Sequence, residues 1–303
     1  ADTGNDRVVG IRLDDPGRAG TIDLIVGGET QGMRDGPPAA ALFRRPQGFA
    51  LSGDMLYVAD TENHTIRAIE LPNGEVTRVA GTGDQSHDWR SPAPPGRPVH
   101  ETQATTTPLN SPWDVCARGE SLFIAMAGFH QIWRLNRASG LISPWSGSGA
   151  EAVEDGPPHE AALAQPSSLA LQDDRLYFAD PESSAIRWAD LDDGVVHTVV
   201  GTGLFDFGDR DGIGDNVRLQ HPLAIAADGL TVFIADTYNN KIKRLDVARR
   251  EVTTWLHETA GLHEPSGLAL TPTHLYIADT NNHRVIVVDR DNAAIFTLGL
   301  QTR

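Results

Sequence analysis

The sequence predicts an all-β fold, a six-bladed β-propeller with four-stranded blades, and three observations lead to it. A short apolar run ends six times in nearly the same phrase, in the copies ADTGND, ADTENH, AMAGFH, ADPESS, ADTYNN and ADTNNH. Self-similarity at a long period is typical of repeat architectures. The apolar runs have strand length, and 30 glycines and 19 prolines among 303 residues supply turns between them. Repeated units of four short strands are the blades of a propeller.

The repeat is regular in its strands and irregular in its connections. Its anchor residues are Asp2, Asp60, Met126, Asp180, Asp236 and Asp279, separated by 58, 66, 54, 56 and 43 residues. Insertions confined to loops explain this variation. We therefore expect a single domain over residues 1–303, with blades at about 1–27, 46–82, 111–147, 166–202, 222–256 and 265–300.

The second blade shows each expected strand in order. The four strands are expected at residues 46–51, 55–60, 65–71 and 76–81. The second strand is almost continuously apolar, as expected for a strand that is covered on both faces. The fourth strand alternates more with polar residues, which predicts an outer edge facing water.

The first blade is incomplete in this chain. Residue 1 already lies at the end of a second strand, and only a third strand at 7–13 and a fourth strand at 21–26 follow. Blade six is complete at residues 294–300, and the three residues after it cannot supply two strands. An open propeller would expose unpaired strand edges, which natural proteins avoid. We therefore expect the chain to be a fragment, with further sequence upstream.

Composition argues against several classes of protein. The chain has no run of 18 apolar residues and no signal-peptide start, so we expect no membrane association. One cysteine, Cys116, excludes an internal disulfide and a CxxC pair, and we expect it to pack in the core. A formal net charge of −16 opposes phosphate backbones, so we expect no nucleic-acid partner. These features favour a cytoplasmic monomer.

Several motifs resemble those of a known family. The phrase ADTxNHxI, the ending VTTxxGTG and the start PxGxAL resemble NHL repeats. The segments SPWDV, IAMAGFHQIW, ADPESSAIR, FDFGDRDG and LQHPL resemble, more closely, the C-terminal propeller of thioredoxin-like/NHL fusion proteins. The resemblance covers essentially the whole chain. It implies an upstream thioredoxin-like domain, which is absent from this chain together with that domain's redox cysteines.

One end of the propeller is expected to carry the function. The long blade-to-blade connections at residues 27–45, 81–111, 147–165, 201–221 and 257–264 all fall at the end that also holds the repeated phrase. The opposite end has only short turns, such as PNGE and DDGV. Because variable loops on a rigid frame usually carry binding, we expect this loop face to be the working surface.

Most of the repeated polar residues have a structural interpretation. The Asp of the phrase is expected to accept backbone N–H groups two residues on, and Asn63, Asn240 and Asn282 are expected to support a tight turn. RDG or EDG triplets at residues 34–36, 154–156 and 210–212 are expected to form turns and N-caps.

Departures from the repeat mark the candidate binding residues. In blade three the phrase becomes AMAGFH, and two interpretations are open: Phe129, His130 and Trp133 present aromatic surface at the rim or pore, or they pack in the core. The full set of candidates on the loop face is Trp113, Asp114, Met126, Phe129, His130, Phe205, Asp206, Asp211 and His221.

A metal site is a weaker expectation. The carboxylates Asp206, Asp209, Asp211 and Asp215 are candidate calcium ligands, although the loop does not fit the EF-hand pattern. No HExxH zinc motif, GxSxG elbow or complete dinucleotide loop occurs. Histidines near the loop face, at positions 64, 130, 221 and 283, would form a metal or acid–base site only if they met on the axis.

The sequence therefore predicts a non-catalytic module that binds a protein or peptide on its loop face. The partner is a separate protein, a peptide or the upstream thioredoxin-like domain, and no cofactor is expected. The alternative is a metal-dependent lyase or hydrolase with a site on the propeller axis.

Overall fold

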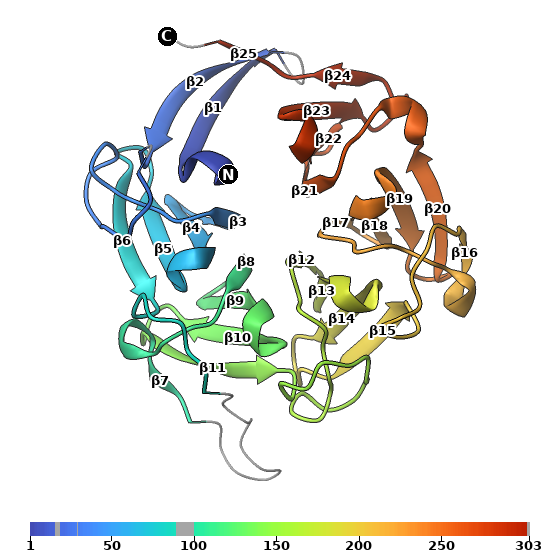
Figure 1. Ribbon diagram of the computed structural model, residues 1–303, viewed down its shortest axis with the longest axis horizontal. Coiled ribbons are helices and arrows are strands. Elements are labelled where there is room, and N and C mark those ends of the chain that lie inside the picture. Colours follow the sequence, from blue (N-terminus) through green and yellow to red (C-terminus); the bar gives the residue numbers. More distant parts are fainter. Residues whose placement is uncertain (16–18, 29, 89–99, 302–303) are drawn as a thin grey trace. The chain divides into compact units, whose positions relative to one another are not determined.

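The computed structural model describes residues 1–15, 19–28, 30–88 and 100–301, so residues 89–99 of the expected loop face lie outside the described residues. The described residues form strands joined by turns and three-residue 3-10 helices (Figure 1). The fold is an all-β, six-bladed propeller, as the sequence predicts. None of the helices in these residues has the length and apolar character needed to cross a bilayer.

The chain divides into two compact units, and the first holds blades two and three. Unit 1 comprises residues 1–10, 23–151 and 157–166. Blade two is an antiparallel sheet of β3 (Pro46–Ser52), β4 (Met55–Asp60), β5 (Thr65–Glu70) and β6 (Glu75–Ala80). Blade three has the order β7-β11-β10-β9-β8, formed by β7 (Thr102–Gln103), β8 (Pro112–Arg118), β9 (Ser121–Met126), β10 (Gln131–Asn136) and β11 (Leu141–Ser146).

The second unit holds blades four to six. Unit 2 comprises residues 11–22, 152–156 and 167–303. Blade four contains β12 (Ser168–Gln172), β13 (Arg175–Asp180), β14 (Ala185–Asp190) and β15 (Val196–Val200). Blade five contains β16 (Gly212–Ile213), β17 (Ala224–Asp228), β18 (Thr231–Asp236), β19 (Lys241–Asp246) and β20 (Glu251–Leu256). Blade six contains β21 (Pro265–Leu270), β22 (His274–Asp279), β23 (Arg284–Asp289) and β24 (Ile295–Thr297).

The first sheet corrects one predicted boundary. Its order is β1-β2-β25, formed by β1 (Val8–Asp15), β2 (Ala19–Val26) and β25 (Gly299–Gln301). Strand β25 pairs in parallel with β2 at Ala19, Gly20 and Thr21. Blade six therefore ends at Thr297 and not at residue 300, because the last strand belongs to the first sheet.

Short 3-10 helices mark the ends of the second strands and parts of the connections. In the described residues they are η1 (Thr3–Asn5), η2 (Thr61–Asn63), η3 (Ala104–Thr106), η4 (Ala127–Phe129), η5 (Pro181–Ser183), η6 (Gly214–Asn216), η7 (Thr237–Asn239), η8 (Glu258–Ala260) and η9 (Thr280–Asn282).

The cores of the units follow from the apolar second strands. Strands β9 and β13 are buried from their second residue onward, as predicted for strands that are covered on both faces. In unit 1, Tyr57, Ile66 and Trp133 belong to one cluster of buried side chains. In unit 2, Tyr177, Ile234 and Leu245 belong to another. Cys116 on β8 is only partly buried, which differs from the expected core position.

The connection before a blade covers part of that blade's outer edge. Strand β16 pairs with β20, and β7 pairs with β11. Isolated bridges join Gly36 to Val76 and Gly156 to Val196 in the same way. The polar alternation of the fourth strand predicted a free edge facing water. In these blades, part of that edge is instead paired with the preceding connection.

A repeated hydrogen bond joins successive blades within each unit. Each acceptor side chain belongs to a residue with a left-handed backbone at the end of a 3-10 helix, and each donor N–H precedes the proline that leads into the next blade. The pairs are Asp6 with Arg45 at 2.7 Å, His64 with Ser111 at 3.0 Å, Ser184 with His221 at 3.2 Å, and Asn240 with Glu264 at 2.7 Å. The imidazole of His64 thus satisfies a backbone group.

Candidate functional site

The Asp of the repeated phrase is structural, but its partner differs from the prediction. Its Oδ1 atom accepts the N–H of a residue sixteen positions earlier, at 2.7 Å in each case, and the pairs are Asp60 with Arg44, Asp236 with Gln220, and Asp279 with His263. Its Oδ2 atom accepts Nδ2 of the Asn three residues later, at 2.8 Å, in Asn63, Asn239 and Asn282. Asn63 and Asn282 therefore act through their side chains, whereas Asn240 has the expected left-handed backbone.

Three blades add a fully buried cation to this Asp. Blades two, four and five carry Arg67, Arg187 and Lys243 seven residues after it, and each side chain has no exposed area. Arg67 reaches Asp60 at 2.9 Å, Arg187 reaches Asp180 at 3.0 Å, and Lys243 reaches Asp236 at 3.5 Å. We call each cation together with its carboxylates a buried cation clamp.

Each clamp also fixes the connection that precedes its blade. Its second carboxylate is the Asp of the RDG or EDG triplet, and the distances are 2.6 Å for Arg67–Asp35, 3.1 Å for Arg187–Asp155 and 3.0 Å for Lys243–Asp211. The same carboxylates accept a backbone N–H of the fourth strand, from Arg78, Thr198 and Thr254. The triplets are structural, as predicted, but they hold a connection against a blade and do not act as helix N-caps.

Blade three replaces the whole clamp with apolar side chains. Met126, Phe129 and Trp133 occupy the positions of Asp, Asn and Arg, with exposed fractions of 0%, 2% and 1%. Phe129 stacks on Trp133 with ring centroids 5.7 Å apart, and Trp133 Nε1 donates to Gln131. The prediction that Met126, Phe129 and His130 present binding surface is therefore wrong. These residues are buried because an apolar cluster fills the space that an ion pair fills elsewhere.

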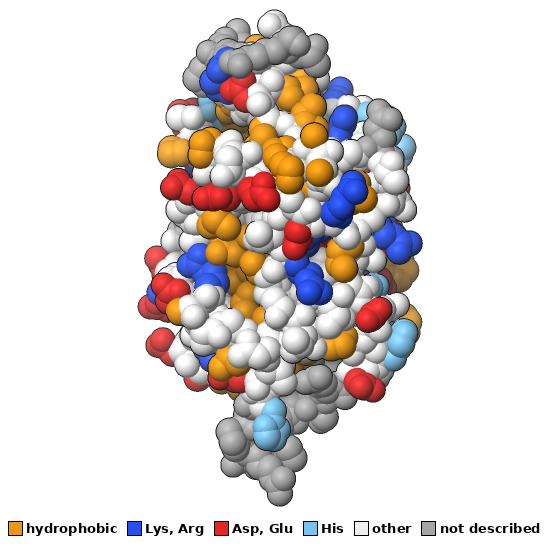
Figure 2. Space-filling view, turned by 90° about the vertical axis from the view of Figure 1, so that its left-hand side faces the viewer, with side chains coloured by type: hydrophobic (Ala, Val, Ile, Leu, Met, Phe, Trp, Pro, Cys, Tyr) orange, Lys and Arg blue, Asp and Glu red, His pale blue; other side chains and the backbone are white. Residues whose placement is uncertain are grey.

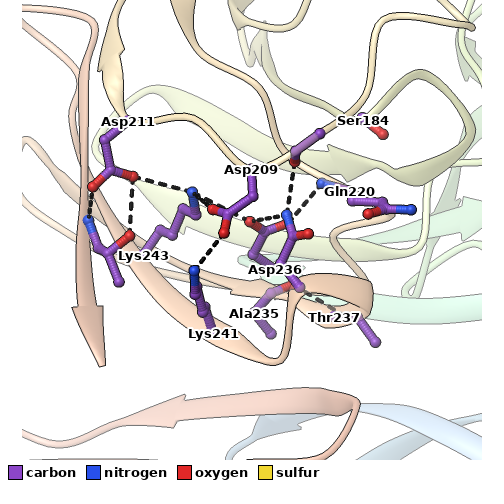
Figure 3. Close-up of polar contacts among 12 residues, drawn as sticks. Ser184, Asp209, Asp211, Gln220, Ala235, Asp236, Thr237, Lys241 and Lys243 are labelled. Carbon is purple, nitrogen blue, oxygen red and sulfur yellow. Dashed lines mark hydrogen bonds and ion pairs between the residues drawn. The ribbon is translucent and has the colours of Figure 1, made fainter. Parts of the chain in front are cut away.

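The four candidate metal carboxylates are bonded to protein groups. Figure 3 shows two of them, Asp209 and Asp211, beside Lys243. Asp209 accepts from Lys241 and from Lys243, the latter at 2.7 Å. Asp215 pairs with Arg250 at 2.9 Å, and Asp206 accepts Oγ1 of Thr202 at 2.8 Å. Within the described ranges no group of three His, Cys, Asp or Glu residues has the arrangement needed to hold a metal ion.

In the blade-five clamp, the pKa values of the two carboxylates are shifted in opposite directions, with that of Asp236 raised and that of Asp211 lowered. Burial raises the pKa of Asp236 to about 6, against the hydrogen bonds from Asn239 and Gln220. Burial also acts to raise the pKa of Asp211, but bonds from Thr254 and Lys243 outweigh it, so that pKa lies below its ordinary value. Burial raises the pKa of Asp60 in blade two to about 6 as well. Asp60 and Asp236 are thus carboxyl groups whose ionisation burial opposes.

The loop at residues 201–221 exposes aromatic side chains. Phe205 is 88% exposed and Phe207 is 57% exposed. Tyr238 on η7 is 52% exposed and stacks on His221, with ring centroids 4.5 Å apart and an interplanar angle of 10°. We call these four residues the aromatic surface of blade five. The sequence predicted Phe205 and His221 but missed Tyr238, although Glu62 and Asn281 hold its position in two other copies.

This loop is held by hydrogen bonds on both sides of its aromatic residues. Asp206 N–H donates to Gly203, and Gly208 N–H donates to Leu219 at 2.9 Å. Nδ2 of Asn239 donates to the Gly208 carbonyl at 2.7 Å, which ties the loop to the helix that carries Tyr238. Arg210 and Arg218 exchange backbone hydrogen bonds. The exposed phenyl rings are therefore presented by a fixed backbone.

The remaining candidates, Trp113 and Asp114, belong to unit 1. Trp113 and Asp114 are both on β8 and partly exposed. The Asp114 carboxylate accepts its neighbour's N–H, from Val115, at 2.8 Å. Strand β3 passes so close that a Cβ at Gly48 would lie 2.0 Å from Asp114 Oδ1. This aspartate therefore packs between two blades, and Gly48 permits the approach.

Comparisons with known proteins identify the repeat. A family model described as NHL repeat matches residues 43–69. The chain is 36% identical to NHL repeat-containing protein 2 of Homo sapiens, over 98% of this chain and 45% of that protein. It is 40% identical to Protein SUPPRESSOR OF QUENCHING 1, chloroplastic, of Arabidopsis thaliana, over 89% of this chain and 28% of that protein. The chain spans less than half the length of these curated relatives.

Solved structures with little sequence identity share the fold. A crystal structure of a nidogen/laminin complex matches with a TM-score of 0.60 and 15% identity, over 84% of this chain and 80% of that chain. A streptogramin B lyase structure matches with a TM-score of 0.54 and 12% identity, over 85% and 69%. At such identities the likeness concerns the fold alone. The chain is an NHL-repeat β-propeller, homologous over most of its length to part of NHL repeat-containing protein 2.

Proposed function

We propose that this propeller is a non-catalytic module that binds a protein or peptide, and that the aromatic surface of blade five is its contact site. The observation that carries the proposal is the 88% exposure of Phe205 in a loop whose backbone is fixed by hydrogen bonds. Aromatic residues are enriched at interface hot spots, because they bury a large area with few rotatable bonds. A fixed loop also loses little conformational entropy on binding.

The charge distribution supports a protein or peptide over a nucleic acid. The chain carries a formal net charge of −16. On the face drawn in Figure 2, acidic, basic and hydrophobic side chains are mixed, and no large area is uniformly basic. Binding to a phosphate backbone depends on clustered Lys and Arg side chains.

The length of the relatives suggests where a partner is found. The chain spans 45% of the human relative, so the remainder of such a protein is available as an intramolecular partner. The upstream thioredoxin-like domain implied by the family resemblance is the specific candidate that we propose. The alternative function, a metal-dependent lyase or hydrolase, stays a prediction that no contact among the described residues favours.

Selection from a random peptide library tests the proposal. The full chain is compared with Phe205→Ala/Phe207→Ala and with Leu230→Ala, a control that removes a 57% exposed side chain from the β17–β18 turn. We expect enriched peptides to bind the parent chain and the control equally. The double variant should bind at least about tenfold more weakly, since burying one Phe contributes about 1.5–3 kcal/mol. Equal binding to all three proteins would remove the aromatic surface as the site.

A further inference from the structure

In the part of the chain that the structure describes, the loop at residues 201–221 has one carboxylate without a cationic partner. Asp206 stands between Phe205 and Phe207 in the sequence and is exposed. Its carboxylate accepts a hydrogen bond from Thr202 Oγ1 at 2.8 Å, and within the described residues it forms no ion pair. The Thr202 hydroxyl and the Gly203 carbonyl hold the residue at both its side chain and its backbone. An acidic group held by these two contacts thus stands in the sequence between two exposed phenylalanines.

The other carboxylates of the same loop are neutralised by the fold. Asp209 and Asp211 bond to Lys243, and Asp215 pairs with Arg250. The two arginines of the loop donate hydrogen bonds to backbone carbonyls of the same loop. Nε of Arg210 donates to the Asn216 carbonyl at 2.5 Å, and Nη1 of Arg218 donates to the carbonyls of Asp215 and Val217 at 2.7 Å. The loop therefore pairs three of its carboxylates with cations, holds its two arginines on backbone carbonyls, and leaves the Asp206 carboxylate exposed.

We propose that the occupant of this surface is a basic peptide segment, in which a Lys or Arg side chain lies beside an apolar residue. The cationic group pairs with Asp206 and lies near the faces of Phe205 and Phe207, while its methylene stem and the apolar neighbour cover the rings. A cation near an aromatic face is attracted by the ring quadrupole. Lys and Arg stems also pack readily on apolar surface. This inference rests on the proposed function and adds the chemical class of the partner.

The net charge of the chain favours the same class of partner. A formal charge of −16 attracts cationic segments over a distance and raises their association rate at low salt. Glu182 adds a carboxylate next to the aromatic surface, since its Oε1 atom lies 3.9 Å from Nδ1 of His221. Neutral apolar peptides would use the phenyl rings but not Asp206. Acidic peptides would be repelled.

A matched pair of peptides separates charge from apolar contact. A library peptide that binds the parent chain but not Phe205→Ala/Phe207→Ala is synthesised with Arg and with citrulline, which keeps the shape and removes the charge. Affinities are measured by fluorescence anisotropy at low and moderate salt. The proteins are the parent chain, Asp206→Asn, and the control Asp192→Asn, which makes the same charge change in the exposed β14–β15 turn.

We expect the Arg peptide to bind at least tenfold more tightly than its citrulline form, and salt to weaken only the Arg form. Asp206→Asn should remove most of that difference, and Asp192→Asn should leave it intact. If citrulline binds as well as Arg while binding still requires the phenyl rings, the basic-peptide inference is overturned and the proposed function stands. If no selected peptide requires the phenyl rings, both fail.

Discussion

Lys243 occupies a position where two other blades carry arginine. The guanidinium groups of Arg67 and Arg187 each reach two carboxylates through separate nitrogens. An ammonium is a compact point charge without this fork geometry. Blade five compensates with Asp209, whose Oδ1 lies 2.7 Å from Lys243 Nζ (Figure 3). The acidic FDFGDRDG segment, which the sequence suggested as a cation site, is thus partly explained by a lysine that needs more carboxylates.

Removing the blade-five cation should be strongly destabilising. Lys243→Met would leave the buried Asp236 without its cation, and breaking a buried ion pair costs about 3–5 kcal/mol. Lys241→Met is the matched control, because Lys241 is partly exposed and pairs with Asp209 and Glu258 at the edge of the site. We expect the control to cost less than about 1 kcal/mol. Urea unfolding of both variants measures the difference, and a loss of less than about 1 kcal/mol in Lys243→Met would show that the clamp adds little stability.

The variant Asp236→Asn tests how burial changes the pKa of the Asp236 carboxyl group. Burial raises the pKa of Asp236 from 3.8 to about 6. The folded state therefore binds this proton more tightly than the unfolded state. The resulting stability is fully present below the unfolded value and is lost as pH rises through about 6. Because Asn does not titrate, the parent chain should gain on the order of 1 kcal/mol over Asp236→Asn between about pH 7.5 and pH 5.

The comparison between two proteins is needed because other groups titrate in the same range. Burial lowers the pKa of His64, His159 and His221, so their contribution to the free energy of unfolding decreases as the pH falls. They contribute equally to both proteins and cancel in the difference between the two unfolding free energies. A difference that stays constant with pH would mean that Lys243 keeps Asp236 ionised throughout.

At the scale of the element, the repeated turn shows what the sequence could and could not predict. The strand positions and the structural role of Asp60 follow from apolar periodicity and from the recurrence of the phrase. The partner of Asp60 does not. Strand β3 pairs with β4 so that Pro46 lies opposite Asp60, which brings the N–H of Arg44 to the carboxylate. A hydrogen bond between residues sixteen positions apart depends on the register of the two strands. That register cannot be predicted from the sequence of the turn alone.

Blade three shows how a coordinated departure from the repeat is accommodated. Met126, Phe129 and Trp133 replace the polar clamp at the same three positions, so they pack with one another inside the blade. The sequence does indicate core packing in blade three, because all three positions change together to apolar residues. A single change at one of them would have left a buried polar group unpaired, which is costly. A coordinated apolar change indicates core packing and not a site.

Restoring only one polar residue in blade three tests this explanation. Met126→Asp would bury a carboxylate with neither an arginine nor an asparagine beside it, and we expect a loss of roughly 3–5 kcal/mol. Leu51→Asp on β3 is the control, because that side chain is 63% exposed and its replacement should change stability by no more than about 0.5 kcal/mol. Thermal and urea unfolding compare the two. A mild effect of Met126→Asp would indicate that the site admits water or a compensating cation.

At the scale of the whole molecule, the sequence predicted the propeller and its family but not that β25 joins the first sheet. Strand β25 pairs in parallel with β2, and its residues carry no part of the repeated phrase. The arrangement around the proposed surface follows only partly from the sequence. Phe205 and Asp206 are exposed and His221 is partly buried, whereas the stacking of Tyr238 on His221 was not predicted. Such contacts follow from tertiary packing.

We infer that the blade-five clamp holds the loop at residues 201–221 in a fixed conformation that presents Phe205 and Phe207. Amide hydrogen exchange measures this directly. We predict slow exchange at Gly208, Arg210 and Arg218, whose N–H groups are bonded within the protein, and faster exchange at these amides in Lys243→Met. Exchange at the rate of an unstructured peptide throughout this loop in the parent chain would contradict the claim.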